Sequence, residues 1–299
     1  MQICCAGEVM IELAAENSGG LYRRGVAGDS YNTAIYLSRA GLQVSYLTRL
    51  GDDALSDGII AHLADEGIGD ALIERVARRR PGLYLIDNDA QGERHFHYWR
   101  DHAPVRELFA QPLRLPAIDV FYFTGITLAV TRPGLAQLIA LLVDLRARGC
   151  RIVFDPNYRP ALWDDIQQAR QHCAAVLPLC DMVMPTFSDD TALWDCHGIA
   201  DSCAHYQQYG VAELVIKGAD LVSHVFTAGE QVEQRAPAVA ALDTTGAGDA
   251  FNAAYLAARL QGGSLRDALT SAQQLSAAVV QHRGAIIPRA GNRAECSRS

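Results

Sequence analysis

Short apolar runs alternate with stretches of helical periodicity along most of the chain. The runs are typical of buried strands, and apolar residues recurring every three or four positions indicate amphipathic helices. Gly41 and Gly67 stand directly after two helical stretches, where glycine commonly ends a helix. The alternation predicts an α/β fold with a mostly parallel central sheet and helices on both faces. Expected strands cover 2–5, 45–50, 120–124, 151–155, 182–185 and 213–216, and expected helices 30–40, 57–66, 132–148, 163–177, 250–260 and 264–282.

Two stretches, 10–26 and 83–104, break this alternation. In the second, apolar runs flank a polar turn, which predicts a β-hairpin. Alternation along its second strand places Phe96, Tyr98 and Arg100 on one face. We expect a small β-layer beside a single α/β domain, and two antiparallel strands further along the chain. The expected domain covers 1–290, the antiparallel strands cover 223–227 and 231–237, and a disordered tail of low hydrophobicity covers 291–299.

Composition narrows the class of protein. The 299 residues are 49% hydrophobic, enough for a large core. The 26 Lys and Arg against 34 Asp and Glu give a net charge of −8, so we expect neither nucleic acid nor a membrane surface as a partner. The chain lacks a signal-like N-terminus and an apolar run of about 20 residues, and a cytoplasmic location is expected. Its 8 cysteines form no Cys-x-x-Cys pair, which predicts buried, reduced thiols.

The segment 243–249 carries the clearest chemical signal. Gly246, Ala247 and Gly248 stand directly before a predicted helix, where accessible backbone amides and the positive helix end favour an anion. A tight turn that merely starts a helix is the alternative. A dinucleotide-binding fingerprint would need glycine where Phe251 stands, and no Gly-Lys-Ser/Thr triplet of a phosphate-binding P-loop occurs nearby.

Asp249 is unusual, because a carboxylate at an anion-binding turn repels a phosphate. In phosphoryl transfer it could accept the proton of an attacking hydroxyl. The helix N-terminus is expected to keep its pKa low, and positioning then matters more than basicity. The alternative is a carboxylate that only stabilises the helix, by roughly 0.3–1 kcal/mol.

Three strings resemble the signatures of the ribokinase-like (PfkB) carbohydrate kinases. Asp-Thr-Thr-Gly-Ala-Gly-Asp-Ala-Phe-Asn at 243–252 is similar to the C-terminal signature, and residues 27–34 and 49–53 are similar to the N-terminal one. The resemblance covers nearly the whole chain. It implies a ribokinase-like fold in which 10–26 and 83–104 form an inserted small β-sheet lid, the use of ATP and Mg²⁺, and transfer of a phosphoryl group to a sugar hydroxyl. Whether a monovalent cation also takes part is left open.

The resemblance also implies roles for individual residues. Where the family usually has Asn-x-x-Glu, this chain has Thr-Phe-Ser-Asp at 186–189, so Asp189 is the expected metal contact. Asn32 could instead brace a helix, and Lys217 could be a solvated strand end. The implied base is Asp249; the anion hole is Gly246, Ala247 and Gly248; the sugar contacts are Gly28, Asp29 and Asn32; the nucleotide contacts are Lys217, Gly218, Asp220, Thr245, Gly246 and Gly248.

Residues 155–163 and 92–100 are further similar to the family's 2-keto-3-deoxygluconate kinases. A sugar acid carries a carboxylate, and the guanidinium groups of Arg100 and Arg159 match its two oxygens. Tyr84 and Tyr98 are expected to complete the sugar site, or to form a lid core or dimer contact. The resemblance implies phosphorylation of the acid's terminal hydroxyl.

Two alternatives stay open. In a kinase for a neutral sugar such as fructose or ribose, the two arginines would form lid salt bridges. A non-catalytic sugar-binding protein could have the same fold. Apolar residues on both faces of the lid predict a homodimer formed through it.

Overall fold

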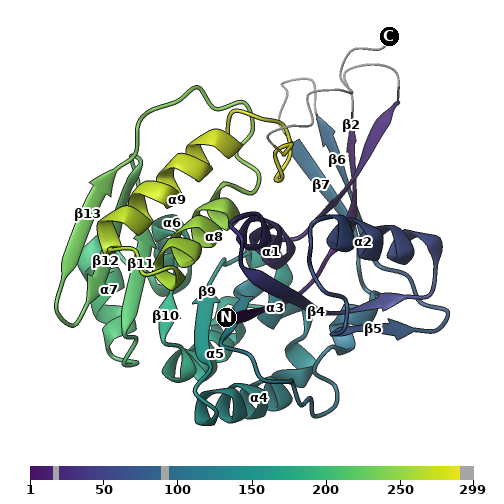
Figure 1. Ribbon diagram of the computed structural model, residues 1–299, viewed down its shortest axis with the longest axis horizontal. Coiled ribbons are helices and arrows are strands. Elements are labelled where there is room, and N and C mark those ends of the chain that lie inside the picture. Colours follow the sequence, from purple (N-terminus) through teal and green to yellow (C-terminus); the bar gives the residue numbers. More distant parts are fainter. Residues whose placement is uncertain (16–19, 89–93, 290–299) are drawn as a thin grey trace.

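The computed structural model describes residues 1–15, 20–88 and 94–289. Within them the main sheet has nine strands in the order β13-β12-β11-β10-β9-β8-β1-β4-β5. Its two edge strands, β13 and β5, lie on opposite sides of the molecule in Figure 1. All neighbours from β11 to β5 pair in parallel, whereas β11, β12 and β13 pair antiparallel. The strands are β1 Gln2–Ala6, β4 Gln43–Gly51, β5 Ile73–Val76, β8 Val120–Thr124, β9 Arg151–Asp155, β10 Met182–Val183, β11 Glu213–Lys217, β12 Val222–Thr227 and β13 Gln231–Arg235.

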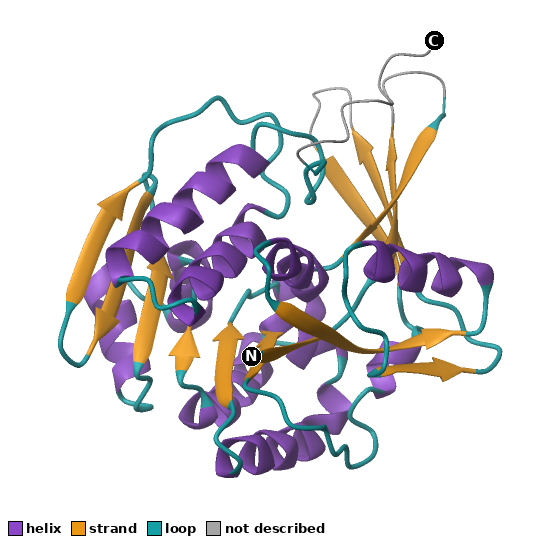
Figure 2. Cartoon of the chain, viewed as in Figure 1, coloured by secondary structure: helices purple, strands orange, loops and turns teal. Residues whose placement is uncertain are grey.

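Helices cover both faces of this sheet, as Figure 2 shows. Strand β1 explains why, because its side chains alternate between two separate apolar clusters: Ile3 and Cys5 belong to one, and Cys4 and Ala6 to the other. The predicted fold class is therefore confirmed. The helices are α1 Asp29–Arg39, α2 Ala54–Asp65, α3 Gly125–Val130, α4 Leu135–Ala147, α5 Ile166–Val176, α6 Phe187–Trp194, α7 Ile199–Gln207, α8 Ala247–Leu260 and α9 Leu265–Val279, with 3₁₀ turns at Pro104–Glu107, Arg132–Gly134, Pro160–Leu162 and Leu177–Leu179.

A second sheet of four strands projects from the body on the side of β4 and α2 (Figure 1). Its order is β3-β2-β6-β7, from β2 Met10–Ala15, β3 Tyr22–Ala27, β6 Gly82–Asn88 and β7 Arg94–Trp99. Strands β6 and β7 pair antiparallel, as in the predicted hairpin, and residues 89–93 of its turn lie outside the described part of the chain. The rings of Phe96 and Tyr98 lie beside one another on one face, as the alternation predicts, and the Tyr84 ring lies beside both. We call this four-stranded sheet the lid.

Several elements differ from the sequence predictions. Strand β5 and helices α3, α6 and α7 were not predicted. The helix predicted over 163–177 begins only at Ile166, because the Asp165 side chain accepts a hydrogen bond from the backbone of Gln168 and caps it there. The predicted tail, 291–299, lies outside the described residues.

Other expectations concern the described chain as a whole. The seven cysteines within it are buried and free of disulfides. None of its helices combines the length and the apolar character that crossing a membrane requires.

Candidate active site

A cleft of about 590 Å³ opens between the lid and the main sheet. Its lining includes Glu8 just after β1, Asp155 at the end of β9 and Lys217 at the end of β11. These strands are parallel, so the cleft lies at their carboxyl ends, where α/β proteins bind ligands. The N-terminal turns of α1 and α8 and the inner face of the lid complete the lining.

The predicted base Asp249 lies in the first turn of α8, at this cleft. The side-chain amide of Asn32 on α1 donates a hydrogen bond of 2.8 Å to its Oδ2. Burial raises the pKa of Asp249 to about 8, and the negative charge of Asp29 adds to the rise. The predicted low pKa is therefore wrong, because burial and a neighbouring carboxylate outweigh the helix end. A carboxylate with a pKa near neutrality is well suited to accept a proton.

Asp29 begins α1 on the same wall of the cleft. Its Oδ2 accepts a hydrogen bond of 2.8 Å from Asn157, and its Oδ1 accepts one of 2.8 Å from the backbone of Ser30. Burial raises its pKa as well. A side chain in place of Gly28 would put its Cβ 2.2 Å from the carbonyl oxygen of Glu8, so the chain needs glycine at this close approach.

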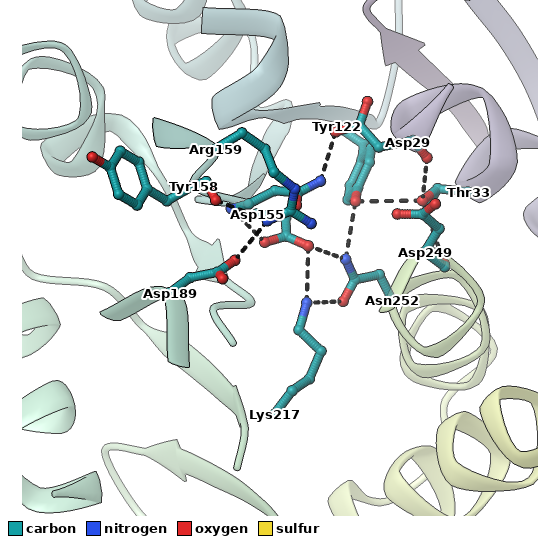
Figure 3. Close-up of polar contacts among 11 residues, drawn as sticks. Asp29, Thr33, Tyr122, Asp155, Tyr158, Arg159, Asp189, Lys217, Asp249 and Asn252 are labelled. Carbon is teal, nitrogen blue, oxygen red and sulfur yellow. Dashed lines mark hydrogen bonds and ion pairs between the residues drawn. The ribbon is translucent and has the colours of Figure 1, made fainter. Parts of the chain in front are cut away.

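A buried polar network fixes the floor of the cleft (Figure 3). The Lys217 ammonium donates to Asp155 Oδ2 at 2.8 Å and to Asn252 Oδ1 at 2.9 Å. The Asn252 amide donates in turn to Asp155 Oδ2 at 2.5 Å and to the Tyr122 hydroxyl at 3.1 Å. Lys217 is therefore no solvated strand end, because its side chain is only 11% exposed and two of its three donors are in use.

A second cavity of about 250 Å³ lies between β11–β12 and α8–α9. Its walls are mainly apolar, with Leu221 and Val239 on one side and Phe251 and Val280 on the other. It shares three lining residues with the cleft: Thr186, Lys217 and Gly248. We call it the nucleotide cavity, since an apolar pocket leading to a helix N-terminus suits a base followed by phosphates.

The glycines at this junction have different roles. Gly246 has φ 75°, and a Cβ there would lie 2.6 Å from the Cβ of Ala285, so glycine is required by both strain and space. A Cβ at Gly248 would meet nothing within 4 Å, so it would project into the open space where a phosphate fits. The amide of Ala247 donates to the Thr244 carbonyl at 3.3 Å, so it is not free to cradle an anion in this conformation.

The other predicted nucleotide contacts divide into two groups. Gly218 lines the nucleotide cavity, and Thr245 lines the cleft, with its hydroxyl donating to Asp243 at 2.7 Å. Asp220 lines neither. It has φ 53°, and its carbonyl accepts a hydrogen bond from Arg235, which indicates a structural position in the turn before β12.

Both predicted substrate arginines line the cleft. Arg100 is 8% exposed, with Nη1 3.0 Å from Glu8 Oε2 and its guanidinium 4.2 Å above the Tyr98 ring. Arg159 donates to the Tyr158 carbonyl at 2.8 Å and to Asp189 at 3.3 Å. Burial raises the pKa of Glu8 to about 7 even though Arg100 opposes the rise.

Tyr84 and Tyr98 also line the cleft, and the Tyr84 hydroxyl donates to Glu12. The sequence analysis missed four buried polar residues here: Glu8, Asp155, Asn157 and Asn252. Asp155, Asn157 and Asn252 lie within the strings that resemble the family's signatures, whereas Glu8 lies outside all of them and had no sequence signal.

The residues at the cleft fit Mg²⁺ carried by a nucleotide. Asp189 lines the cleft, and burial raises its pKa, so a nearby cation would stabilise its charged form. Within 1–15, 20–88 and 94–289, no three His, Cys, Asp or Glu side chains cluster as a metal cage. Mg²⁺ needs no such cage, because it is usually bound by one or two carboxylates together with substrate phosphates.

Comparison with known proteins identifies the class. The family model described as pfkB family carbohydrate kinase matches residues 1–290. The chain therefore belongs to the pfkB family of carbohydrate kinases, as its signatures predict. The 2-dehydro-3-deoxygluconokinase of Escherichia coli K12 is 39% identical over 96% of this chain and 97% of its own.

Two more distant relatives complete the comparison. The fructokinase of Klebsiella pneumoniae is 29% identical over 86% of this chain and 83% of its own. An E. coli protein provisionally named Ribokinase II, solved in complex with ATP and Mg²⁺, has a TM-score of 0.86 at 25% identity over 95% of this chain and 94% of its own. That complex supports nucleotide and metal use within this fold.

Proposed function

We propose that this protein transfers the γ-phosphoryl group of ATP to the terminal hydroxyl of 2-keto-3-deoxygluconate, giving the 6-phospho product. The observation that carries the proposal is that Arg100 and Arg159 line the same cleft as Asp249. A carboxylate held by the two guanidinium groups would leave the other end of the acid free to reach the base. The identity of 39% to an E. coli kinase named for this substrate supports the choice.

In this proposal each group of residues has its own role in substrate binding or phosphoryl transfer. Gly28, Asp29 and Asn32 hold the sugar hydroxyls at the N-terminus of α1. Asp249 accepts the hydroxyl proton as the phosphorus–oxygen bond forms. The α8 N-terminus with Gly246 and Gly248 stabilises the charge on the transferred group. Mg²⁺, when bound with the nucleotide, would supply further charge neutralisation beside Asp189.

A neutral-sugar kinase is the second candidate, and one observation favours it. Both arginines already have a carboxylate partner, Glu8 for Arg100 and Asp189 for Arg159. These ion pairs are the ones expected if the arginines only stabilised the lid and its neighbouring loop.

Measuring ADP release with Mg-ATP and a panel of acceptors separates the candidates. The proposal expects turnover of 2-keto-3-deoxygluconate, and turnover of fructose or ribose without the acid would refute it. Arg100→Ala and Arg159→Ala should each lower kcat/KM for the acid by roughly 10- to 100-fold, because a hydrogen bond to a charged group contributes about 1.5–3 kcal/mol. Absence of ADP release with every acceptor would support the alternative of a non-catalytic sugar-binding protein.

Three finer expectations accompany the proposal. We infer a cytoplasmic location, since ATP is the phosphoryl donor. Dependence on a monovalent cation is tested by comparing rates in potassium and tetramethylammonium chloride. A homodimer through the lid is supported by the exposure of Leu21 and Trp99, at 60% and 59%. Light scattering of the wild type and Trp99→Glu tests the dimer, and an unchanged mass in the variant would contradict it.

A further inference from the structure

A third cavity, of about 410 Å³, adjoins the cleft on the lid side. It shares Tyr98, Arg100, Ile126 and Arg159 with the cleft, so these four residues border the opening between the two spaces. Its own walls add two more guanidinium groups, those of Arg106 and Arg132, the carboxylates of Asp101 and Asp164, and the apolar side chains of Leu162 and Trp163. We call it the side cavity.

Arg106 is the unusual member of this group. Arg132 already has partners, since it donates to the Leu162 carbonyl at 2.8 Å and to Asp164 at 3.0 Å. Arg106 lies on the 3₁₀ turn Pro104–Glu107 and is half-buried, and its guanidinium has no hydrogen bond or ion pair with the described part of the chain. Its positive charge nevertheless lowers the pKa of Glu8, so it lies close to that carboxylate.

Glu8 explains why a further cation is needed at this opening. It is 2% exposed, and neither carboxylate oxygen has a hydrogen-bond donor with suitable geometry among the described residues, although Arg100 Nη1 lies 3.0 Å away. If a sugar acid bound to Arg100, its carboxylate and that of Glu8 would both lie against the Arg100 guanidinium. Two buried like charges repel strongly unless another cation compensates. Arg106 is the nearby cation whose guanidinium forms no ion pair with any carboxylate in the described part of the chain.

We propose that Arg106 binds the carboxylate of the sugar-acid substrate from the side cavity and, with Arg100, sets the preference for acids over neutral sugars. This inference rests on the proposed function. The carboxylate would lie at the opening, where Arg100 and Arg159 border both spaces, and the apolar walls of the side cavity would reduce its contact with water. An anion in such surroundings gains more from each guanidinium than it would in water.

Steady-state kinetics of Arg106→Gln, Arg106→Lys and the control Arg132→Gln tests the inference, with thermal melting to confirm folding. Arg106→Gln should raise KM for 2-keto-3-deoxygluconate by roughly 10- to 100-fold with kcat within about threefold, because it removes a binding contact. Arg106→Lys should restore part of the affinity. Arg132 lines the same cavity, but Arg132→Gln should change KM for the acid by less than about threefold. KM for a neutral sugar should be unaffected.

The inference is overturned if Arg106→Gln leaves KM for the acid unchanged, or if it raises KM equally for acid and neutral sugars. An equal rise in Arg132→Gln would also overturn it, since a general positive potential would then explain the effect. A wild type that turns over only neutral sugars refutes the proposed function separately. Calorimetry of sugar-acid binding then decides on Arg106: weaker binding by Arg106→Gln supports its role, and equal Kd values overturn it.

Discussion

Asp249→Asn should abolish most of the activity and yet stabilise the fold above neutral pH. The substitution keeps the shape of the side chain and an oxygen that can accept the hydrogen bond from Asn32. It removes the proton acceptor, and general-base catalysis contributes roughly 10²- to 10⁴-fold to rates. We therefore expect kcat to fall by that factor, with the KM for ATP little changed.

The stability effect follows from the pKa. Burial raises the pKa of Asp249 from 3.8 to about 8, so between these values the folded state holds a proton that the unfolded state has released. Wild-type stability therefore decreases as pH rises through this window, by at most about 1.4 kcal/mol per pH unit. Since the carboxylate still meets solvent in the cleft and titrates together with Asp29, about 1–3 kcal/mol is expected between pH 5 and pH 8.

Urea unfolding of wild type and Asp249→Asn at pH 5, 6, 7 and 8 measures this loss. The difference in free energy of unfolding should grow with pH in favour of the variant. A difference that stays constant with pH, or that shrinks as pH rises, would refute the reasoning about burial. Retained activity in the variant would refute the role of Asp249 as base.

Two further substitutions test the junction and the network. Gly246→Ala should lower the free energy of unfolding by about 1–3 kcal/mol and reduce kcat, because the residue has φ 75° and its Cβ would lie 2.6 Å from Ala285. Thermal melting measures the stability and ADP release measures the activity. An unchanged melting temperature would contradict the strain. Lys217→Met should cost about 3–5 kcal/mol, because it leaves Asp155 buried and unpaired. Adding Asp155→Asn to Lys217→Met should recover part of the lost free energy of unfolding, measured by chemical denaturation. A double variant less stable than Lys217→Met alone would argue against the lost ion pair as the cause.

The buried strands were the most predictable part of the fold. The strands at Val120–Thr124 and Arg151–Asp155 match their predicted bounds, because unbroken apolar runs can be satisfied only between two layers of helices. Helices α6 and α7 were missed because they are short, at 8 and 9 residues, and carry little periodic signal. Such helices are stabilised mainly by their tertiary contacts.

Residues of the candidate site were predictable where they lie within a short sequence motif. Asp249 and Asn32 were singled out from separate strings, and the structure brings them within hydrogen-bond distance across 217 positions. The pKa of Asp249 was predicted with the wrong sign, because the sequence displays the local helix end but not burial or the distant Asp29. Glu8 and Arg106 were missed for the same reason, since their significance arises only from neighbours assembled by the fold.

The lid contributes to one half of the active site alone. Lid residues line the cleft and the side cavity, whereas no described residue of β2, β3, β6 or β7 lines the nucleotide cavity. Substitutions in the inserted strands can therefore alter which acceptor is chosen without disturbing the donor pocket. An architecture divided in this way allows acceptor preference to diverge during evolution while the phosphoryl donor stays the same, so related kinases can share one donor and differ in their sugars.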